Sequence, residues 1–235
     1  MQKLNVFYED KDIIVCEKPQ GVPSQSDKTN DIDMTGIIKN YLFSANKKPN
    51  PYVGIVHRLD RPVGGIMVYA KSEKALKNLN VQIRNSEISK YYLAVGEVTD
   101  GDYKPDDNYK ILCDYIIKDG KGNTSRICDN IPGSKLAKLE YRIIDSLKEE
   151  KLILMEIKLH TGRHHQIRVQ MANEGLPLWG DSKYNKDFTK RHSELRWFNI
   201  ALYAYKLEFN HPVTNEHMIF TNKPVNYMCF NRFYK

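Results

Sequence analysis

One stretch constrains the fold more than any other: Asp60 lies between two arginines and is followed by Pro62, a glycine pair and an apolar run over 66–70. Proline lacks an N–H group and restricts the residue before it, so no helix or strand is expected to run through Pro62. The glycines let the backbone approach another segment closely. The apolar run is typical of a short buried strand. We therefore expect Asp60 on a tight, partly exposed loop that leads into a core strand.

Asp60 has two interpretations on such a loop. The flanking Arg58 and Arg61 favour the ionised carboxylate at neutral pH, which suits a nucleophile or a general base. The same three side chains could form a structural ion pair or cap a turn, which is the commoner role of such a cluster taken alone. Other motifs in the chain are needed to choose between the catalytic and the structural interpretation.

Composition narrows the class of protein. The chain has 235 residues, enough for one large domain or two small ones, and 41% of them are hydrophobic, as in ordinary globular proteins. The net charge of +7 favours a polyanionic partner, nucleic acid first. The chain shows no apolar signal core and no run of transmembrane length, so we expect a cytoplasmic protein.

Hydrophobic spacing predicts the elements. Strands are expected at 12–17, 66–70, 90–98, several times within 111–141, and at 151–159, 200–208 and 218–220; helices at 35–43, after Ser72 as the cap, and at 164–174; loops at 24–33, 99–109 and 182–196. Strands outnumber helices, and hairpin spacing prevails over the spacing of parallel units. The predicted class is α+β, a mixed and mainly antiparallel sheet with a few helices packed on it.

The cysteines and histidines bear on metal binding. No two of the four cysteines form a CxxC pair, and Cys16, Cys113 and Cys128 lie in apolar runs, so we expect small buried side chains. His160, His164 and His165 are close in sequence, which leaves a metal-dependent hydrolase as an alternative. Gly162 interrupts the helix that this spacing would need, and no HExxH motif is present.

Two further stretches carry side chains suited to chemistry. Lys90 and Tyr92 lie two apart, hence on one strand face, where the tyrosine could act on a proton, stack on a base, or simply pack in a sheet. The segment 161–168 predicts a turn and a helix N-terminus, which suits a phosphate, with Arg163 as an added donor. Arg168 lies about one and a half turns into that helix, so it could reach a core carboxylate or remain a surface arginine.

These stretches, taken together and in order, resemble the RluA-type pseudouridine synthases from about residue 12 to the end. The matching residues are His57-Arg58-Leu59-Asp60, Gly65 to Lys71, Lys90-x-Tyr92-x-Ala94, Thr161-Gly162-Arg163-x-His165-Gln166-Ile167-Arg168-Val169, Gly180-Asp181, Lys18-Pro19-x-Gly21 and His211-Pro212. The chain departs from common family residues at Val63-Gly64, His164, Gln170 and Leu139.

The resemblance implies isomerisation of a uridine in RNA to pseudouridine, without cofactor or metal. Asp60 matches the catalytic aspartate, Tyr92 the active-site tyrosine, and Arg168 the arginine that pairs with the aspartate. Arg58 matches the arginine associated with rearrangement of the RNA around the target. The implied fold is one catalytic domain over residues 1–235, with a cleft across a long curved sheet and no added N-terminal RNA-binding domain.

RNA, either rRNA or tRNA, is the expected partner of a monomeric protein. The side chains expected to contact it are Lys18, Arg58, Arg61, Lys71, Lys90, Arg163 and His165. A binding module of the same fold without activity is the alternative, and the intact set of Asp60, Tyr92 and Arg168 weighs against it.

Overall fold

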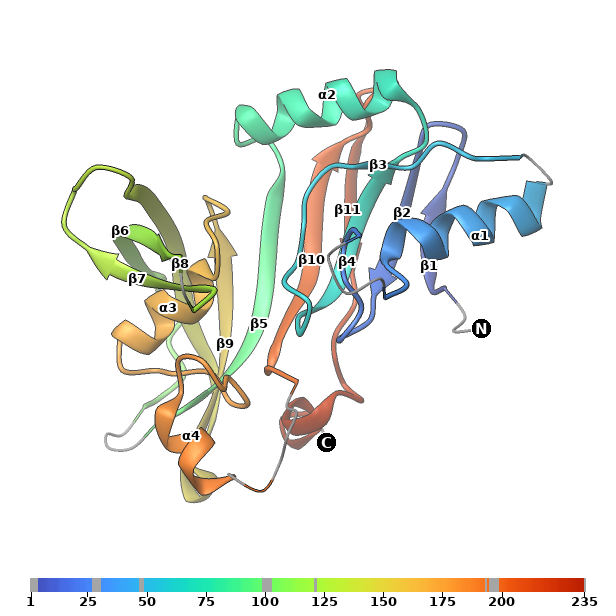
Figure 1. Ribbon diagram of the computed structural model, residues 1–235. Helices are drawn as coiled ribbons and strands as arrows, with labels where there is room; N and C mark the ends of the chain where they lie inside the picture. The colour runs from blue at the N-terminus through green and yellow to red at the C-terminus, as the bar shows by residue number, and fades with distance from the viewer. Residues whose placement is uncertain are drawn as a thin grey trace. The chain divides into compact units, whose positions relative to one another are not determined.

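A computed structural model describes residues 4–26, 31–46, 49–98, 103–120, 122–192, 194 and 199–234, and Figure 1 labels their helices and strands. Parts of the loops predicted at 24–33, 99–109 and 182–196 lie outside these residues. The chain divides into two compact units. Unit 1 combines residues 1–89 with 204–222, and unit 2 combines 90–203 with 223–235.

Four strand pairs of unit 1 are antiparallel. Its strands are β1 (Val6–Glu9), β2 (Ile13–Lys18), β3 (Gly54–Ile55), β4 (Gly64–Ala70), β10 (Leu202–Asn210, in this unit from Ala204 on) and β11 (His217–Thr221). The order is β1-β2-β4-β10, with β3 paired to β4 and β11 to β10. Every residue of β4 is buried, which confirms the core strand predicted to follow Asp60.

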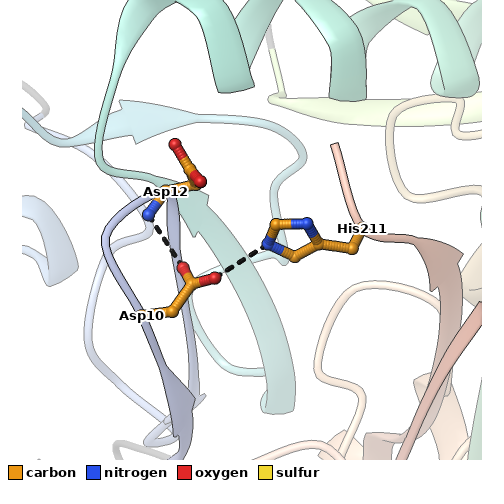
Figure 2. A group of neighbouring side chains, drawn as sticks. All are labelled: Asp10, Asp12 and His211. Carbon is orange, nitrogen blue, oxygen red and sulfur yellow. Dashed lines mark hydrogen bonds and ion pairs between the residues drawn. The ribbon is translucent and has the colours of Figure 1, made fainter. Parts of the chain in front are cut away.

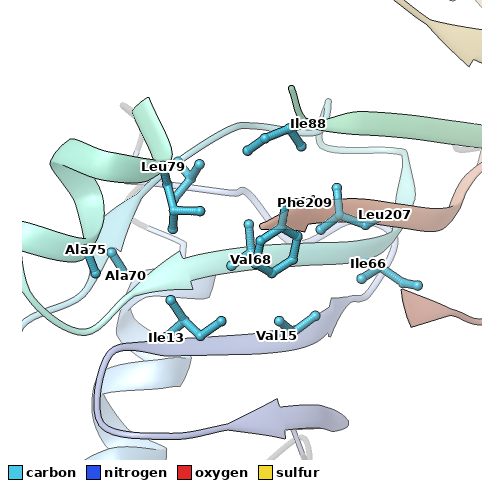
Figure 3. Packing of buried hydrophobic residues seen from close by; sticks show 11 residues of the cluster. Ile13, Val15, Ile66, Val68, Ala70, Ala75, Leu79, Ile88, Leu207 and Phe209 are labelled. Atoms are coloured by element: carbon cyan, nitrogen blue, oxygen red, sulfur yellow. The ribbon is translucent and has the colours of Figure 1, made fainter. Parts of the chain in front are cut away.

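Two helices, α1 (Met34–Asn46) and α2 (Glu73–Arg84), complete unit 1. The Ser72 hydroxyl accepts a hydrogen bond from the Ala75 N–H at 3.2 Å, which confirms the predicted cap of α2. Figure 3 shows the core that α2 covers: Ala75 and Leu79 join one buried cluster with residues of β2, β4 and β10, among them Val68 and Phe209. The spacing of Ala75 and Leu79 places both on one helix face.

Unit 2 is antiparallel throughout the strand order β5-β9-β8-β6-β7. Its elements are β5 (Ser89–Glu97, in this unit from Lys90 on), β6 (Lys110–Asp119), β7 (Thr124–Cys128), β8 (Lys135–Leu147), η1 (Lys148–Glu150), β9 (Leu152–Leu159), α3 (Gln166–Asn173), α4 (Lys186–Arg191) and η2 (Met228–Arg232). Val169 of α3 packs with Ile116 of β6 and Ala137 of β8. The predicted α+β class is confirmed.

Three predictions of local structure were wrong. Strand β1 precedes the strand expected to be first. Helix α4 lies within the predicted loop 182–196, where the Asn185 side chain caps it by accepting from the Phe188 N–H at 3.0 Å. Helix α3 begins at Gln166 instead of 164, because His165 adopts a left-handed conformation with φ +54°.

The cysteine prediction holds in part. Cys16 is buried as expected, whereas Cys113 is exposed and Cys128 is half-buried. Of the helices within the described ranges, none combines the length and the apolar character needed to cross a membrane.

We expect Gly65→Ala to destabilise unit 1 strongly. Gly65 has φ +133°, and an added Cβ would lie 2.4 Å from the carbonyl oxygen of Ala204 on β10. Backbone atoms on both sides have to move, so we expect a loss of about 3 kcal/mol of unfolding free energy, or about 6–12 °C in Tm. Thermal melting measures this, and Gly120→Ala, where nothing lies within 4 Å, is the control. Equal Tm values for the two variants would contradict the packing at Gly65.

Candidate active site

Asp60 lies on the predicted loop in unit 1, half-buried, between β3 and β4. The Val63 N–H donates to the Asp60 carbonyl at 2.9 Å, which closes a tight turn around Pro62. Next to it, the Ser24 hydroxyl donates to the Leu59 carbonyl at 2.8 Å and accepts from the Leu59 N–H at 3.1 Å. The backbone on both sides of the carboxylate is therefore fixed by hydrogen bonds.

The buried side chain of Lys18 also holds the loop of Asp60. The Lys18 ammonium is fully buried and donates to the carbonyl oxygens of Val22 at 2.6 Å and of Pro19 and Arg61 at 3.1 Å. Burial lowers the pKa of Lys18 to about 7. The nearby charge of Arg61 lowers this pKa further, and the charge of Asp60 raises it in part. Lys18 was predicted to contact RNA. Because its charged end is inside the protein, its role in this structure is to hold the Asp60 loop.

Of the other predicted RNA contacts in unit 1, Arg61 and Lys71 have protein partners and Arg58 is exposed. Arg61 donates through Nε to the Gly21 carbonyl at 2.9 Å and forms an ion pair with Asp31 at 2.6 Å. The Lys71 ammonium pairs with Glu9 at 2.6 Å and has a side chain only 15% exposed. Arg58 is exposed. Of these three arginine and lysine side chains, Arg58 is thus the one best placed to meet a partner in solution.

Tyr92 lies in the middle of β5 in unit 2, where it is 5% exposed and faces Ile157 of β9 in the register. Its neighbour on the same strand face is Lys90, and burial lowers the pKa of that lysine. A buried tyrosine on a paired strand has few rotamers available. The prediction that Tyr92 takes part in the reaction is compatible with this fixed position and stays a prediction.

The start of α3 differs from the phosphate site that the sequence predicted. The Gln166 side chain accepts from the Arg163 N–H at 3.0 Å and from the Thr161 hydroxyl at 2.7 Å. One backbone donor of the expected anion site is therefore used within the turn. Arg163 is exposed and donates through Nε to the Leu136 carbonyl at 2.8 Å, so it stays a candidate for RNA contact.

His165 is buried at this turn and bonds through Nδ1 to the Tyr184 hydroxyl at 3.0 Å. Burial, followed by the charges of Arg168, His164, Lys183 and Lys118, lowers the pKa of His165 to about 2. The ring is therefore neutral at neutral pH. The predicted RNA contact through His165 would thus lack a positive charge.

Arg168 is 4% exposed, which excludes the surface interpretation. Its Nε donates to Asp181 Oδ2 at 2.8 Å and its Nη2 to Asp181 Oδ1 at 2.7 Å, and Asp181 is fully buried. The prediction that Arg168 reaches a core carboxylate is confirmed. Sequence reasoning gave Asp181 no role. Gly180 before it was the available signal, since a glycine there permits the sharp turn at φ +77°. The predicted pair of Asp60 and Arg168 stays a prediction.

The three histidines of the metal alternative have separate protein partners. His160 bonds to Glu140 at 2.8 Å, His164 to Ser125 at 2.9 Å, and His165 to Tyr184. Within the described residues, they do not form a cluster of ligand atoms lying within 4.8 Å of one another.

The group that does meet this distance is Asp10, Asp12 and His211 in unit 1, drawn in Figure 2. Hydrogen bonds join Asp10 and His211 as a clamp between two turns, whereas Asp12 Oδ2 is buried without a hydrogen-bond partner among the described residues. His211 Nδ1 accepts from the Thr214 N–H at 3.1 Å, so the proton is on Nε2, which donates to Asp10 at 2.9 Å. Asp10 also accepts from the N–H groups of Asp12 and Ile13, both at 2.8 Å.

The fold is that of solved pseudouridylate synthase structures. Human RNA pseudouridylate synthase domain containing 4 superposes with a TM-score of 0.72 at 20% identity, covering 93% of this chain and 88% of that one. Human RNA pseudouridylate synthase domain containing 1 gives a TM-score of 0.73 at 18% identity, covering 97% and 86%. At these identities the comparison establishes the fold class.

Sequence comparison establishes the family. The family model for RNA pseudouridylate synthases matches residues 12–173, and the chain belongs to this family. The ribosomal large subunit pseudouridine synthase D of Vibrio cholerae is 34% identical over 234 residues, covering 92% of this chain and 66% of that protein. An uncharacterized RNA pseudouridine synthase of Aquifex aeolicus is 32% identical, covering 92% and 68%. The chain thus spans about two thirds of the length of these relatives. The RluA-type resemblance is confirmed.

Proposed function

We propose that the protein isomerises one or more uridines in structured RNA to pseudouridine, with Asp60 as the catalytic carboxylate. The observation that carries this proposal is the family match over 12–173, which spans Asp60, Tyr92 and Arg168 together. The net charge of +7 supports RNA as the partner. Because the matched relatives in Vibrio cholerae and Haemophilus influenzae are named for the ribosomal large subunit, rRNA is the first substrate to test and tRNA the second.

The chemistry requires few groups. The glycosidic C–N bond of the uridine breaks, the base turns, and C5 of the base bonds to the same sugar carbon. An ionised carboxylate can attack the base or sugar, or take a sugar proton and stabilise the developing charge. The target base is stacked in RNA, so it has to be flipped into a pocket. No electron is gained or lost, and we expect neither cofactor nor metal.

The surroundings of Asp60 and Arg168 support their proposed roles. The hydrogen bonds at Leu59 and Val63 fix the loop of Asp60, and Asp181 fixes Arg168. Exposed Arg58 and Arg163 are the proposed contacts to flanking phosphates. We propose that the protein acts as a monomer in the cytoplasm, where rRNA and tRNA are accessible.

The proposal is tested by release of hydrogen from C5. Bond formation at C5 displaces its hydrogen, so purified protein should release tritium from transcripts made with 5-tritiated uridine. Large-subunit rRNA fragments and tRNA transcripts are compared, and pseudouridine maps of cells with and without the protein locate the target. Tight RNA binding without tritium release, and identical maps in the two cell lines, would favour the inactive binding module.

We expect Tyr92→Phe to slow the chemical step more than it weakens RNA binding. The ring remains for packing against Ile157 or for stacking, and only the hydroxyl is lost. Loss of a group that moves a proton costs about 10²–10⁴-fold in rate in general. Single-turnover tritium release at saturating enzyme measures the rate, and Tyr115→Phe, on a partly exposed position of β6, is the control. A collapsed affinity with an unchanged rate would make Tyr92 an RNA contact.

A further inference from the structure

Arg168 lies in a set of contacts more extensive than one ion pair. Its guanidinium has five N–H donors, and the fork on Asp181 uses Nε and one side of Nη2. The donors of Nη1 are not part of that fork. A bidentate pair fixes the plane of the guanidinium as well as its position. Asp181 therefore determines where the second edge of Arg168 is directed.

Asp181 is itself fixed by its own turn. Its Oδ1 accepts from the backbone N–H of Lys183 at 3.0 Å and of Tyr184 at 3.3 Å. The turn depends on Gly180, because a Cβ there would lie 2.4 Å from the carbonyl oxygen of Asn199. The carboxylate is thus held in place by backbone groups independently of the arginine. A side chain held in this way can orient a partner without reorganising.

Tyr184 supports the guanidinium from one face. The Arg168 Cζ lies 5.2 Å from the centroid of the Tyr184 ring, a cation–π arrangement. The tyrosine hydroxyl accepts from the Ser125 N–H of β7 at 2.6 Å. It forms a second hydrogen bond with Nδ1 of His165 at 3.0 Å. Both of these bonds keep the Tyr184 ring plane fixed beneath Arg168.

We propose that Asp181 and Tyr184 are positioning residues of the isomerase: they hold the Arg168 guanidinium in the one orientation that its role in the reaction requires. This rests on the proposed function, in which Arg168 is a catalytic residue. Asp181 fixes the direction of the guanidinium and balances its charge, and Tyr184 fixes the plane of the guanidinium. Neither is proposed to touch the uridine.

The main test is Asp181→Asn, which keeps the size of the side chain and removes its charge. We expect the single-turnover rate at saturating enzyme to fall about 10–100-fold, because small displacements of a catalytic group have effects of this size, while RNA affinity changes little. Tyr184→Phe keeps the ring and loses both hydroxyl bonds, and we expect a smaller loss of about tenfold or less. The control is Asp187→Asn on α4, an aspartate 68% exposed with the same change of charge, which should leave the rate unchanged.

A double-mutant cycle separates positioning from general stability. If Asp181 acts through Arg168, Asp181→Asn should cost little further rate in an Arg168→Lys background. The same fold-loss in both backgrounds, or a wild-type rate for Asp181→Asn alone, would overturn the proposal. If Asp181→Asn does not fold, the same cycle with Tyr184→Phe decides by the same criterion.

A readout without RNA keeps this proposal distinct from the proposed function. The Arg168 Nε–H, bonded to a buried carboxylate, should give a slowly exchanging NMR resonance in wild-type protein and in Asp187→Asn, but not in Asp181→Asn. A slow Arg168 Nε–H that survives in Asp181→Asn would show that Asp181 does not hold the guanidinium. Failure of wild-type protein to release tritium from any RNA would instead reject the proposed function.

Discussion

Asp60→Asn should abolish isomerisation and leave folding and RNA affinity nearly unchanged. Asparagine keeps the shape of the side chain but cannot act as an anionic nucleophile or base. The turn itself should persist, because the hydrogen bond that closes it joins the Val63 N–H to the backbone carbonyl of Asp60. The three carbonyl oxygens that Lys18 binds also belong to the backbone. We therefore expect a folded, RNA-binding and inactive protein.

The measurement compares single-turnover tritium release, RNA affinity and thermal melting for the variant and the wild-type protein. Asp129→Asn, an exposed aspartate after β7, matches the change of net charge and should retain the full rate. Turnover by Asp60→Asn close to that of wild-type protein would exclude Asp60 as the catalytic carboxylate. A variant that melts much earlier would point to the structural ion-pair interpretation of Asp60.

Substitution of Arg168 should have the second largest effect. Arg168→Lys keeps a positive charge but loses the planar fork that holds both oxygens of Asp181. We expect it to lose much of the single-turnover rate, and Arg168→Ala to lose more. Arg168→Ala also leaves the fully buried Asp181 carboxylate without its charge partner, which costs about 3–5 kcal/mol in general. Rates must therefore be measured well below the melting temperature of each variant.

An alternative role for Arg168 is contact with an RNA phosphate. In that case affinity should fall, with a salt dependence shallower by about one unit of slope, while turnover at saturating enzyme stays normal. Affinity across a salt series and the saturated single-turnover rate separate the two roles. Arg163→Ala, which removes an exposed arginine in the turn before α3, is the control that should follow the phosphate pattern. Normal saturated turnover in both Arg168 variants would reject a catalytic role.

Local signals in the sequence were sufficient for most of the elements. The alternation within 90–98 and 151–159 predicted β5 and β9, and the cap at Ser72 predicted the start of α2. These features arise from contacts within a few residues, so a sequence pattern records them. The misses were short elements: β1 has four residues and α4 has six, with Phe188 as its one buried residue. Elements of this length present at most two full periods of a pattern.

The sequence by itself determined the class of fold, the order of the main elements and the motifs that resemble a pseudouridine synthase. Asp60 could be placed on its loop because Pro62 and the glycines act locally. Only the tertiary structure decided that Lys18 is buried against three carbonyl oxygens, and that Asp181 is a partner of Arg168. The physical reason is that burial and pairing depend on neighbours distant in sequence. Lys18 meets the carbonyl of Arg61, 43 residues away, and no local pattern encodes whether a lysine or an arginine ends in solvent or in the core.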